Sequence, residues 1–263
     1  VYAAASVLFL APATRHPALT DGRAALTVLR VAGRDDRQGW LAGAHLARLA
    51  DGGTIALVSD KTRYGLGLIT GAEAALRELG AAPPLIAHVA SAERDYGELV
   101  RRLGESRVAG LIFGGAAHEA AILRRQLREA GISVPFIGGD ALSDPAFIAA
   151  AGDAGEGTLV MLPPDPDRYP RAQDILRRLD PLGRLPRLEA IQSYAAVELW
   201  RAVAFEGALD ATRPRAPQIA SQIRSKSTET VLGPVRFAAN GDAEIAAFTL
   251  HAWRDRRLVE QAR

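Results

Sequence analysis

The stretch VAGLIFGGAAHEAAILRRQLREAGISVPFIGGD, residues 108–140, decides the fold class of this chain. An apolar run at 108–113 ends in two glycines, and a segment with helical spacing follows at 120–130. A second apolar run at 135–137 then ends in Gly138-Gly139-Asp140. Strand, helix and strand in this order predict a βαβ unit, whose two strands are parallel. Because both runs are apolar throughout, we expect helices on both faces of the sheet.

The same alternation continues outward from this unit along most of the chain. Further strands are predicted at 7–11, 26–31, 54–58, 84–89 and 157–162, and helices at 68–79, 96–103, 145–151, 188–207 and 217–225, with residues 59–67 as a turn. The tail, residues 231–259, predicts short strands with a hairpin turn at Asn240-Gly241-Asp242. We therefore expect an α/β protein with parallel sheets flanked by helices.

The composition excludes several classes of protein. A length of 263 residues fits one large domain or two lobes of ordinary size. Lys and Arg number 32 against 30 Asp and Glu, which is too balanced for a non-specific nucleic-acid binder, so no nucleic-acid partner is expected. The absence of cysteine excludes disulfide scaffolds, thiolate metal sites and cysteine nucleophiles.

Three loops at the carboxyl ends of predicted strands collect glycine and polar residues, at 59–67, 114–119 and 138–144. Open parallel sheets bind ligands at that edge, so together these loops favour a small-ligand site. Within them, Asp140 either caps the following helix or pairs with a ligand cation. Tyr64, just before a glycine, is a candidate for stacking on a small ligand or hydrogen bonding to it.

Catalysis and cofactor binding have little support in the sequence. Gly65-Leu66-Gly67 stands too far from the preceding strand for a dinucleotide fingerprint, no GxSxG surrounds a serine, and the five histidines have no metal-ligand spacing. No cofactor, metal or catalytic residue is predicted. Two alternatives to a plain binding protein stay open: an enzyme using a nucleotide or sugar phosphate on a doubly wound fold, and the ligand-sensing domain of a receptor.

Several segments, in order over almost the whole chain, carry a family resemblance. The chain resembles the type I periplasmic solute-binding proteins of ABC transporters, in the leucine/isoleucine/valine-binding branch. Each segment is weakly specific alone, but their order and spacing together are specific. They are 11–20 (APATRHPALT), 30–39 (RVAGRDDRQG), 60–67 (DKTRYGLG), 113–115 (FGG), 123–131 (LRRQLREAG), 136–140 (FIGGD), 151–157 (AGDAGEG), 230–234 (TVLGP) and 240–242 (NGD).

The resemblance implies a two-lobed periplasmic-binding-protein-like fold, with a first lobe of 1–33 plus 164–246 and a second of 34–163 plus 247–263. It implies a periplasmic protein that binds an amino acid or related small carboxylate in an interlobe cleft, without catalysis, and delivers it to an ABC permease in the membrane. Roughly the first quarter of the family's mature chain precedes the position of Val1. We therefore expect an incomplete first lobe, a truncated chain, and self-association through an exposed sheet edge.

The resemblance also assigns ligand-binding residues in the second lobe. Tyr64 falls on a tyrosine that lines the family's cleft. Asp140 falls on the acidic residue that takes the ligand's α-ammonium group. Ala116 stands where the family often has an aromatic residue, which implies more room for the solute.

In the first lobe the resemblance places the ligand loop at residues 13–15. Ala13 falls on a position whose backbone contacts the ligand. Arg15 aligns with the family threonine that hydrogen-bonds the ligand, and Thr14 lies one residue earlier. A guanidinium can bind a carboxylate through two parallel hydrogen bonds, so Arg15 and Ala116 together argue against leucine and allow a larger or more acidic solute.

Overall fold

The computed structural model describes residues 5, 7–22, 27–90, 93–182, 187–204, 216–245 and 248–261. The chain forms two compact units. Unit 1 comprises Val1–Arg34 and Pro164–Ala247, and unit 2 comprises Asp35–Pro163 and Phe248–Arg263. In the described residues no helix combines the length and the apolar character that crossing a membrane requires.

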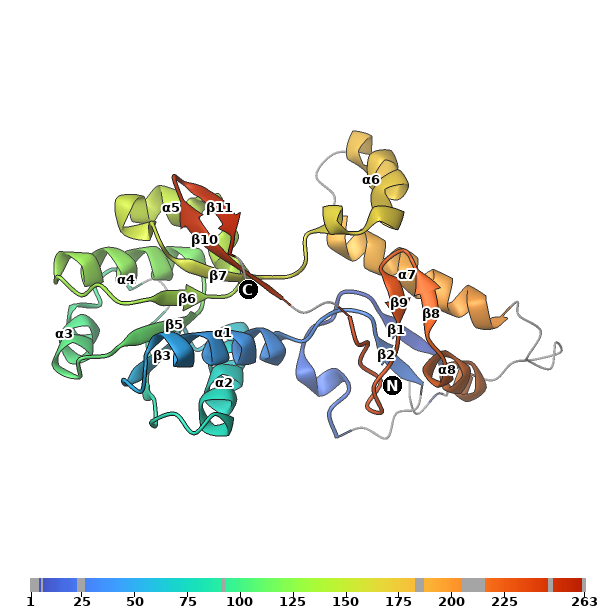
Figure 1. Ribbon diagram of the computed structural model, residues 1–263, viewed down its shortest axis with the longest axis horizontal. Helices are drawn as coiled ribbons and strands as arrows, with labels where there is room; N and C mark the ends of the chain where they lie inside the picture. Colours follow the sequence, from blue (N-terminus) through green and yellow to red (C-terminus); the bar gives the residue numbers. More distant parts are fainter. Residues whose placement is uncertain are drawn as a thin grey trace. The chain divides into compact units, whose positions relative to one another are not determined.

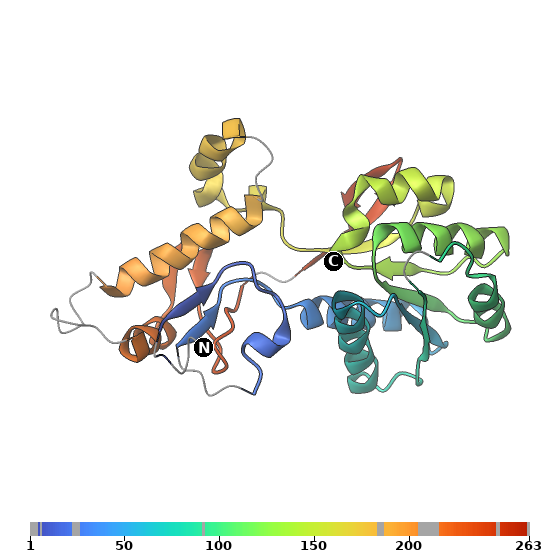
Figure 2. The same ribbon diagram turned by 180° about the vertical axis from the view of Figure 1, so that it is seen from behind.

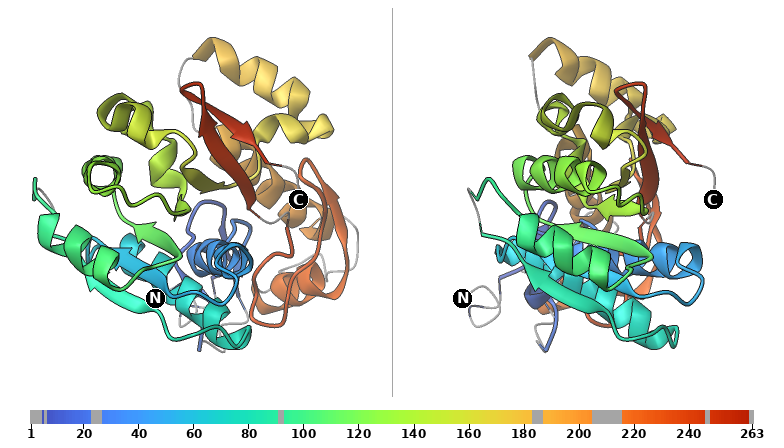
Figure 3. Two further views of the ribbon diagram at one scale, coloured as in Figure 1. Left: turned by 60° about the vertical axis from the view of Figure 1, so that its left-hand side comes forward. Right: turned by 90° about the vertical axis from the view of Figure 1, so that its left-hand side faces the viewer.

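Unit 2 is built on one seven-stranded sheet in the order β11-β10-β7-β6-β5-β3-β4 (Figure 1). Its first five strands along the chain run parallel, and the C-terminal hairpin β10–β11 adds to the edge at β7 in antiparallel fashion (Figure 3). The strands are β3 (Ile55–Ser59), β4 (Leu85–His88), β5 (Gly110–Gly114), β6 (Phe136–Gly138), β7 (Leu159–Leu162), β10 (Thr249–Arg254) and β11 (Arg257–Glu260).

Helices cover both faces of this sheet (Figure 1). Leu57 packs with α1 (Asp35–Leu49) and α2 (Arg63–Glu78) on one face. Its neighbour Val58 packs on the other face with α3 (Gly97–Glu105), α4 (Ala117–Glu129) and α5 (Pro145–Ala151). Because successive side chains of a strand point to opposite faces, a sheet covered on both sides needs the uninterrupted apolar runs seen in the sequence.

Unit 1 combines two small sheets with helices. β1 (Phe9–Ala11) and β2 (Val28–Arg30) pair in parallel, and β8 (Thr228–Thr230) and β9 (Gly233–Val235) form an antiparallel pair. Figure 2 shows α7, the longest orange helix, lying across the strands of this unit. Its buried stripe enters the core with residues of α8 and β9. The helices are α6 (Gln173–Leu179), α7 (Arg187–Ala204) and α8 (Ala216–Ser225), with short 3-10 turns η1 (Pro17–Leu19), η4 (Pro166–Arg168), η5 (Pro170–Ala172) and η6 (Asp180–Leu182).

The predicted α/β class, with a parallel sheet flanked by helices, is confirmed, and two details are corrected. The predicted turn at 59–67 is wrong beyond Thr62, because that residue caps α2 and the helix begins at Arg63. The turn at Asn240-Gly241-Asp242 is present, but it is closed by a single bridge between Phe237 and Ala243 rather than by strands. Residues 205–207 of the helix predicted at 188–207 lie outside the described residues.

Candidate functional site

The three loops singled out in the sequence meet at one edge of the unit 2 sheet, because β3, β5 and β6 are neighbours. Asp60, which is 6% exposed and directly follows β3, joins two of these loops. Its Oδ1 accepts hydrogen bonds from the backbone N–H of Thr62 at 2.9 Å and from the Thr62 hydroxyl at 2.6 Å. Its Oδ2 accepts from the N–H of Ala116 at 3.2 Å. The buried carboxylate therefore fixes both loops.

The start of α2 lies directly against the end of β5. Thr62 caps the helix, since its hydroxyl oxygen accepts from the N–H of Gly65 at 3.0 Å. A Cβ at Gly65 would lie 2.3 Å from the carbonyl oxygen of Gly114, so this approach requires glycine. Gly65, which the sequence analysis considered as part of a dinucleotide fingerprint, is therefore needed for close backbone packing.

Tyr64 and Asp140 lie in direct contact. The Tyr64 hydroxyl donates to Oδ1 of Asp140 at 2.8 Å, and Nε2 of Gln38 donates to the same oxygen at 3.2 Å. Gln38 is fully buried on α1 and also donates to the carbonyl oxygen of Met161 at 2.7 Å. Helices α1 and α2 thus each contribute one donor that orients the carboxylate.

The environment keeps Tyr64 in its protonated, donating form. Burial raises the pKa of the Tyr64 hydroxyl well above its ordinary value, and the adjacent Asp140 charge raises it further. Gly139 allows this contact, because a Cβ there would lie 2.1 Å from the Tyr64 hydroxyl oxygen. The backbone N–H of Ala141 donates to the same hydroxyl at 3.4 Å. The Tyr64 hydroxyl is therefore in contact with Gly139, Asp140 and Ala141.

Of the two roles that the sequence left open for Asp140, the structure gives no support to the cap. Asp140 is the first residue of the 3-10 turn η2 (Asp140–Ser143), and the helix α5 is capped by Asp144, whose Oδ1 accepts from the N–H of Ala146 at 2.8 Å. Asp140 is partly buried, at the edge where the strands end. A carboxylate held in this way is chemically suited to accept hydrogen bonds from a cation.

The predicted ligand loop of unit 1 follows β1. Ala13 and Thr14 are exposed, and Arg15 is partly exposed. The backbone of this loop is hydrogen-bonded by the side chain of Arg30, which is 0% exposed. The Arg30 guanidinium donates to the carbonyl oxygens of Arg15 and His16 at 2.9 Å each, and to that of Pro17 at 3.2 Å. One buried side chain therefore fixes three successive carbonyls.

Arg30 is in turn held by Asp242. Nε of Arg30 donates to Oδ1 of Asp242 at 2.8 Å, and NH1 of Arg34 donates to Oδ2 at 2.9 Å. Burial alone would raise the pKa of the Asp242 carboxyl, but hydrogen bonds from Arg34 and Thr20 and the charges of both arginines lower it below its ordinary value. The turn at Asn240-Gly241-Asp242 thus contributes a charged anchor to the loop.

The predicted site residues fall into two groups. Tyr64 and Asp140 touch, Ala116 is linked to the same edge through Asp60, and all three belong to unit 2. Ala13, Thr14 and Arg15 belong to unit 1. Sequence reasoning missed the supporting residues Gln38, Asp60 and Arg30. For Asp60 and Arg30 the available signal was a polar side chain directly beside or inside an apolar segment, whereas Gln38 gave no such signal; only the fold shows the partners of all three.

Comparison with known proteins places the chain in a family. Residues 1–256 match the family described as "Periplasmic binding protein". The chain is 31% identical over 256 residues to the Leu/Ile/Val-binding protein homolog 2 of Brucella abortus, covering 97% of this chain and 67% of that protein. It is 28% identical over 258 residues to the leucine-, isoleucine-, valine-, threonine- and alanine-binding protein of Pseudomonas aeruginosa, covering 96% and 67%.

The fold is also similar to solved structures. A crystal structure of a putative branched-chain amino acid ABC transporter from Rhodospirillum rubrum superimposes with a TM-score of 0.78 at 21% identity, over 99% of this chain and 74% of that one. At this identity the likeness speaks for the fold alone. Taken with the match over residues 1–256 and the Brucella relative, it leads to one conclusion: the chain belongs to the periplasmic binding protein family.

Proposed function

We propose that this protein is the solute-binding component of an ABC importer. It binds an amino acid or a related small carboxylate, releases it chemically unchanged to a membrane permease, and works in the periplasm. The observation that carries the proposal is the Asp140 carboxylate, held at the sheet edge by Tyr64 and Gln38. The names of the relatives, which include amino-acid-binding proteins, support the class of ligand.

Asp140 is proposed as the partner of the ligand's ammonium group. Removing an ammonium ion from water is costly unless a charged partner replaces its hydration. A charge-assisted hydrogen bond of this kind contributes about 1.5–3 kcal/mol. Because the carboxylate is already oriented by two donors, little of this energy is spent on ordering it.

The loop of unit 1 is proposed to bind the other end of the solute. Arg15 is suited to a carboxylate because its planar guanidinium offers parallel donors, and the exposed Thr14 hydroxyl and Ala13 backbone are polar groups on the same loop. Ala116, a small residue on the loop after β5, leaves space for a side chain of the solute. On this proposal, the two units correspond to the two lobes of the family fold.

A thermal-shift screen with the twenty common amino acids and with aromatic and dicarboxylic acids tests the function. A ligand at about 100 times its Kd stabilises the folded state by about 2.7 kcal/mol, so at least one of these compounds is expected to raise Tm clearly. Asp140→Ala is expected to abolish the shift. Asp51→Asn, a substitution of an exposed turn carboxylate in the same unit, is the control and is expected to keep it. A shift with nucleotides alone, or turnover of any compound, contradicts the proposal.

We also infer that the chain self-associates through the two-stranded sheet β1–β2, because a strand edge in a small sheet can pair with another chain. Sedimentation velocity over a range of concentrations tests this inference. A concentration-dependent dimer that is lost when Leu10 on β1 is replaced by proline supports it, provided that circular dichroism shows the variant is folded. A monomer at all concentrations contradicts it.

A further inference from the structure

Unit 2 contains a cavity of about 260 Å³ whose lining residues belong to none of the three loops described above. It lies between the C-terminal half of α4 and the segment that begins with η3 (Gly152–Gly155). The charged side chains that line it are Arg124 and Arg128 from α4, and Asp153 and Glu156 from the other segment. Ser133 adds a hydroxyl. The cavity is thus lined by cations from one element and by carboxylates from another.

Among the described residues, the two arginines have no anionic partner. In the described part of the chain, neither Arg124 nor Arg128 forms an ion pair or a side-chain hydrogen bond. Nε of Arg124 is buried without a hydrogen bond, and its guanidinium lies 5.7 Å from the centre of the Phe136 ring. Burial lowers the pKa of Arg124, and the positive charge of Arg128 lowers it further. Two like charges four residues apart on a helix repel each other, so the pair is suited to an anion that neutralises both.

The carboxylates on the other segment are not equivalent. Both oxygens of Glu156 accept backbone hydrogen bonds, from the N–H of Asp255 at 3.0 Å and from that of Arg256 at 2.9 Å. The exposed Asp153 carboxylate has no side-chain partner within the described ranges. Glu156 therefore secures the hairpin β10–β11, while Asp153 is available to a ligand cation.

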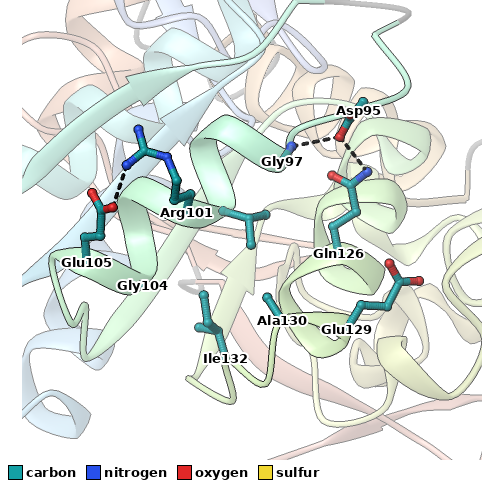
Figure 4. A pocket seen from close by; sticks show the side chains of 10 residues that line it. Asp95, Gly97, Arg101, Gly104, Glu105, Gln126, Glu129, Ala130 and Ile132 are labelled. Carbon is teal, nitrogen blue, oxygen red and sulfur yellow. Dashed lines mark hydrogen bonds and ion pairs between the residues drawn. The ribbon is translucent and has the colours of Figure 1, made fainter.

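The larger groove nearby, between α3 and α4, differs in this respect (Figure 4). Its volume is about 540 Å³, and three of its charged lining residues, Asp95, Arg101 and Glu105, already have partners. Arg101 is bonded to Glu98 and Glu105, and Gln126 donates to Asp95. In the smaller cavity, by contrast, the side chains of Arg124, Arg128 and Asp153 form no hydrogen bond or ion pair with the described residues.

We propose that the cavity of Arg124 and Arg128 binds a small zwitterion that carries a phosphate and an ammonium group, of the phosphoethanolamine type. A carboxylate offers two oxygens to one arginine fork, whereas a phosphate group, as a monoester or as a diester, offers additional oxygens that can accept from a second guanidinium. The ammonium group pairs with Asp153, and the Ser133 hydroxyl donates to a phosphate oxygen. The ligand reaches the site either as a free solute or as the headgroup of a membrane lipid.

Calorimetric titration of the full chain with O-phosphoethanolamine, inorganic phosphate and ethanolamine tests the site. O-phosphoethanolamine is expected to bind most tightly and ethanolamine not measurably. Arg128→Ala and Arg124→Met are expected to weaken binding by at least about tenfold, because each removes a charge-assisted bond. Arg124→Met retains an apolar side chain against Phe136, and Arg128 is exposed, so both variants are expected to fold.

Three further variants separate the site from general electrostatics and from the amino-acid site. Arg125→Ala removes an exposed arginine of the same helix that does not line the cavity, and it is expected to leave the affinity unchanged. Asp153→Asn is expected to bring the affinity for O-phosphoethanolamine down to that for phosphate. Asp140→Asn is expected to leave this binding intact, which distinguishes the site from the amino-acid site. Absence of O-phosphoethanolamine binding, or equal losses with Arg125→Ala and Arg128→Ala, overturns the proposal.

Co-sedimentation with vesicles identifies the source of the ligand. Binding to phosphatidylethanolamine vesicles that free O-phosphoethanolamine competes away assigns the site to a lipid headgroup. Binding of the free compound without vesicle binding assigns it to a solute. Both results support the site, whereas vesicle binding that Arg128→Ala leaves unchanged contradicts it.

Discussion

The Tyr64 hydroxyl and the Asp140 carboxylate, 76 residues apart in the chain, are joined by a hydrogen bond of 2.8 Å. This bond links the first turn of α2 to the loop after β6. Gln38 of α1 donates to the same carboxylate oxygen, so the geometry of Asp140 depends on two helices on one face of the sheet. In the proposed function, this support is what prepares Asp140 for a cation before any solute arrives.

Replacing Tyr64 by phenylalanine removes one of these donors and little else. We expect the affinity for the amino acid to fall about twofold to twelvefold, which corresponds to one hydrogen bond of about 0.5–1.5 kcal/mol. Calorimetric titration measures this change. Tyr96→Phe is the matched control, because Tyr96 is a buried tyrosine of the same unit that does not contact Asp140. Equal affinity of Tyr64→Phe and the wild type would show that the bond has no part in binding.

Gly139→Ala tests the same contact from the other side. The added Cβ would lie 2.1 Å from the Tyr64 hydroxyl oxygen, so the phenol must move away from Asp140. We expect weaker amino-acid binding together with a lower free energy of unfolding, by about 1–3 kcal/mol as in other overpacked sites. Gly67→Ala is the control: nothing lies within 4 Å of its Cβ in α2, so its stability is expected to hold or rise. Binding that survives Gly139→Ala unchanged argues against the role of Tyr64.

Arg30 is expected to control the order of the unit 1 loop. Arg30→Met removes three hydrogen bonds to carbonyls and leaves Asp242 without its buried partner, and breaking such a pair costs about 3–5 kcal/mol. Hydrogen-exchange mass spectrometry of residues 12–20 is expected to show faster exchange than in the wild type. Arg177→Met, which removes an exposed ion pair with Asp174 in the same unit, is expected to change stability by less than about 1 kcal/mol. Unchanged exchange in Arg30→Met would disprove the anchoring role.

The lowered pKa of Asp242 predicts a pH dependence of the stability of unit 1. A carboxyl whose folded pKa lies below its ordinary value of 3.8 stabilises the fold above that value, and this contribution is lost as the pH falls through the folded pKa. Urea denaturation at neutral pH is therefore expected to find Asp242→Asn less stable than the wild type. Below the ordinary pKa the difference is expected to shrink. A gap that stays constant with pH would assign the effect to packing instead.

The sequence was sufficient for the fold class because the central strands β3, β5 and β6 are buried on both faces and are therefore visible as apolar runs. The run at 108–113 is one example, and it overlaps all of β5 except its last residue, Gly114. The helix α1 was not predicted, since small residues such as Gly39 and Gly43 weaken its apolar periodicity. Those glycines allow α2 to pack closely against α1, which only the folded chain reveals: a Cβ at Gly39 would lie 2.0 Å from the carbonyl oxygen of Leu68.

For the candidate site, the sequence indicated the edge and two of its residues but not their support. Parallel-sheet topology was enough to bring the loops of Tyr64, Ala116 and Asp140 to one place. Gln38 could not be found in this way, because a polar residue on a helix is usually solvated and its burial depends on tertiary packing. Arg30 stands at the end of a short apolar strand, and nothing in the sequence indicates that its side chain donates hydrogen bonds to backbone carbonyls of a loop fifteen residues upstream.

The central claim is that Asp140 accepts the ammonium group of an amino acid. Its most direct test is calorimetric titration of the wild type and Asp140→Asn with the best amino acid from the screen and with its deaminated analogue, the same carboxylic acid without the amino group. The account predicts that the wild type prefers the amino acid by at least about tenfold and that Asp140→Asn loses this preference. Equal binding of both compounds by the wild type, or an undiminished preference in Asp140→Asn, would contradict it.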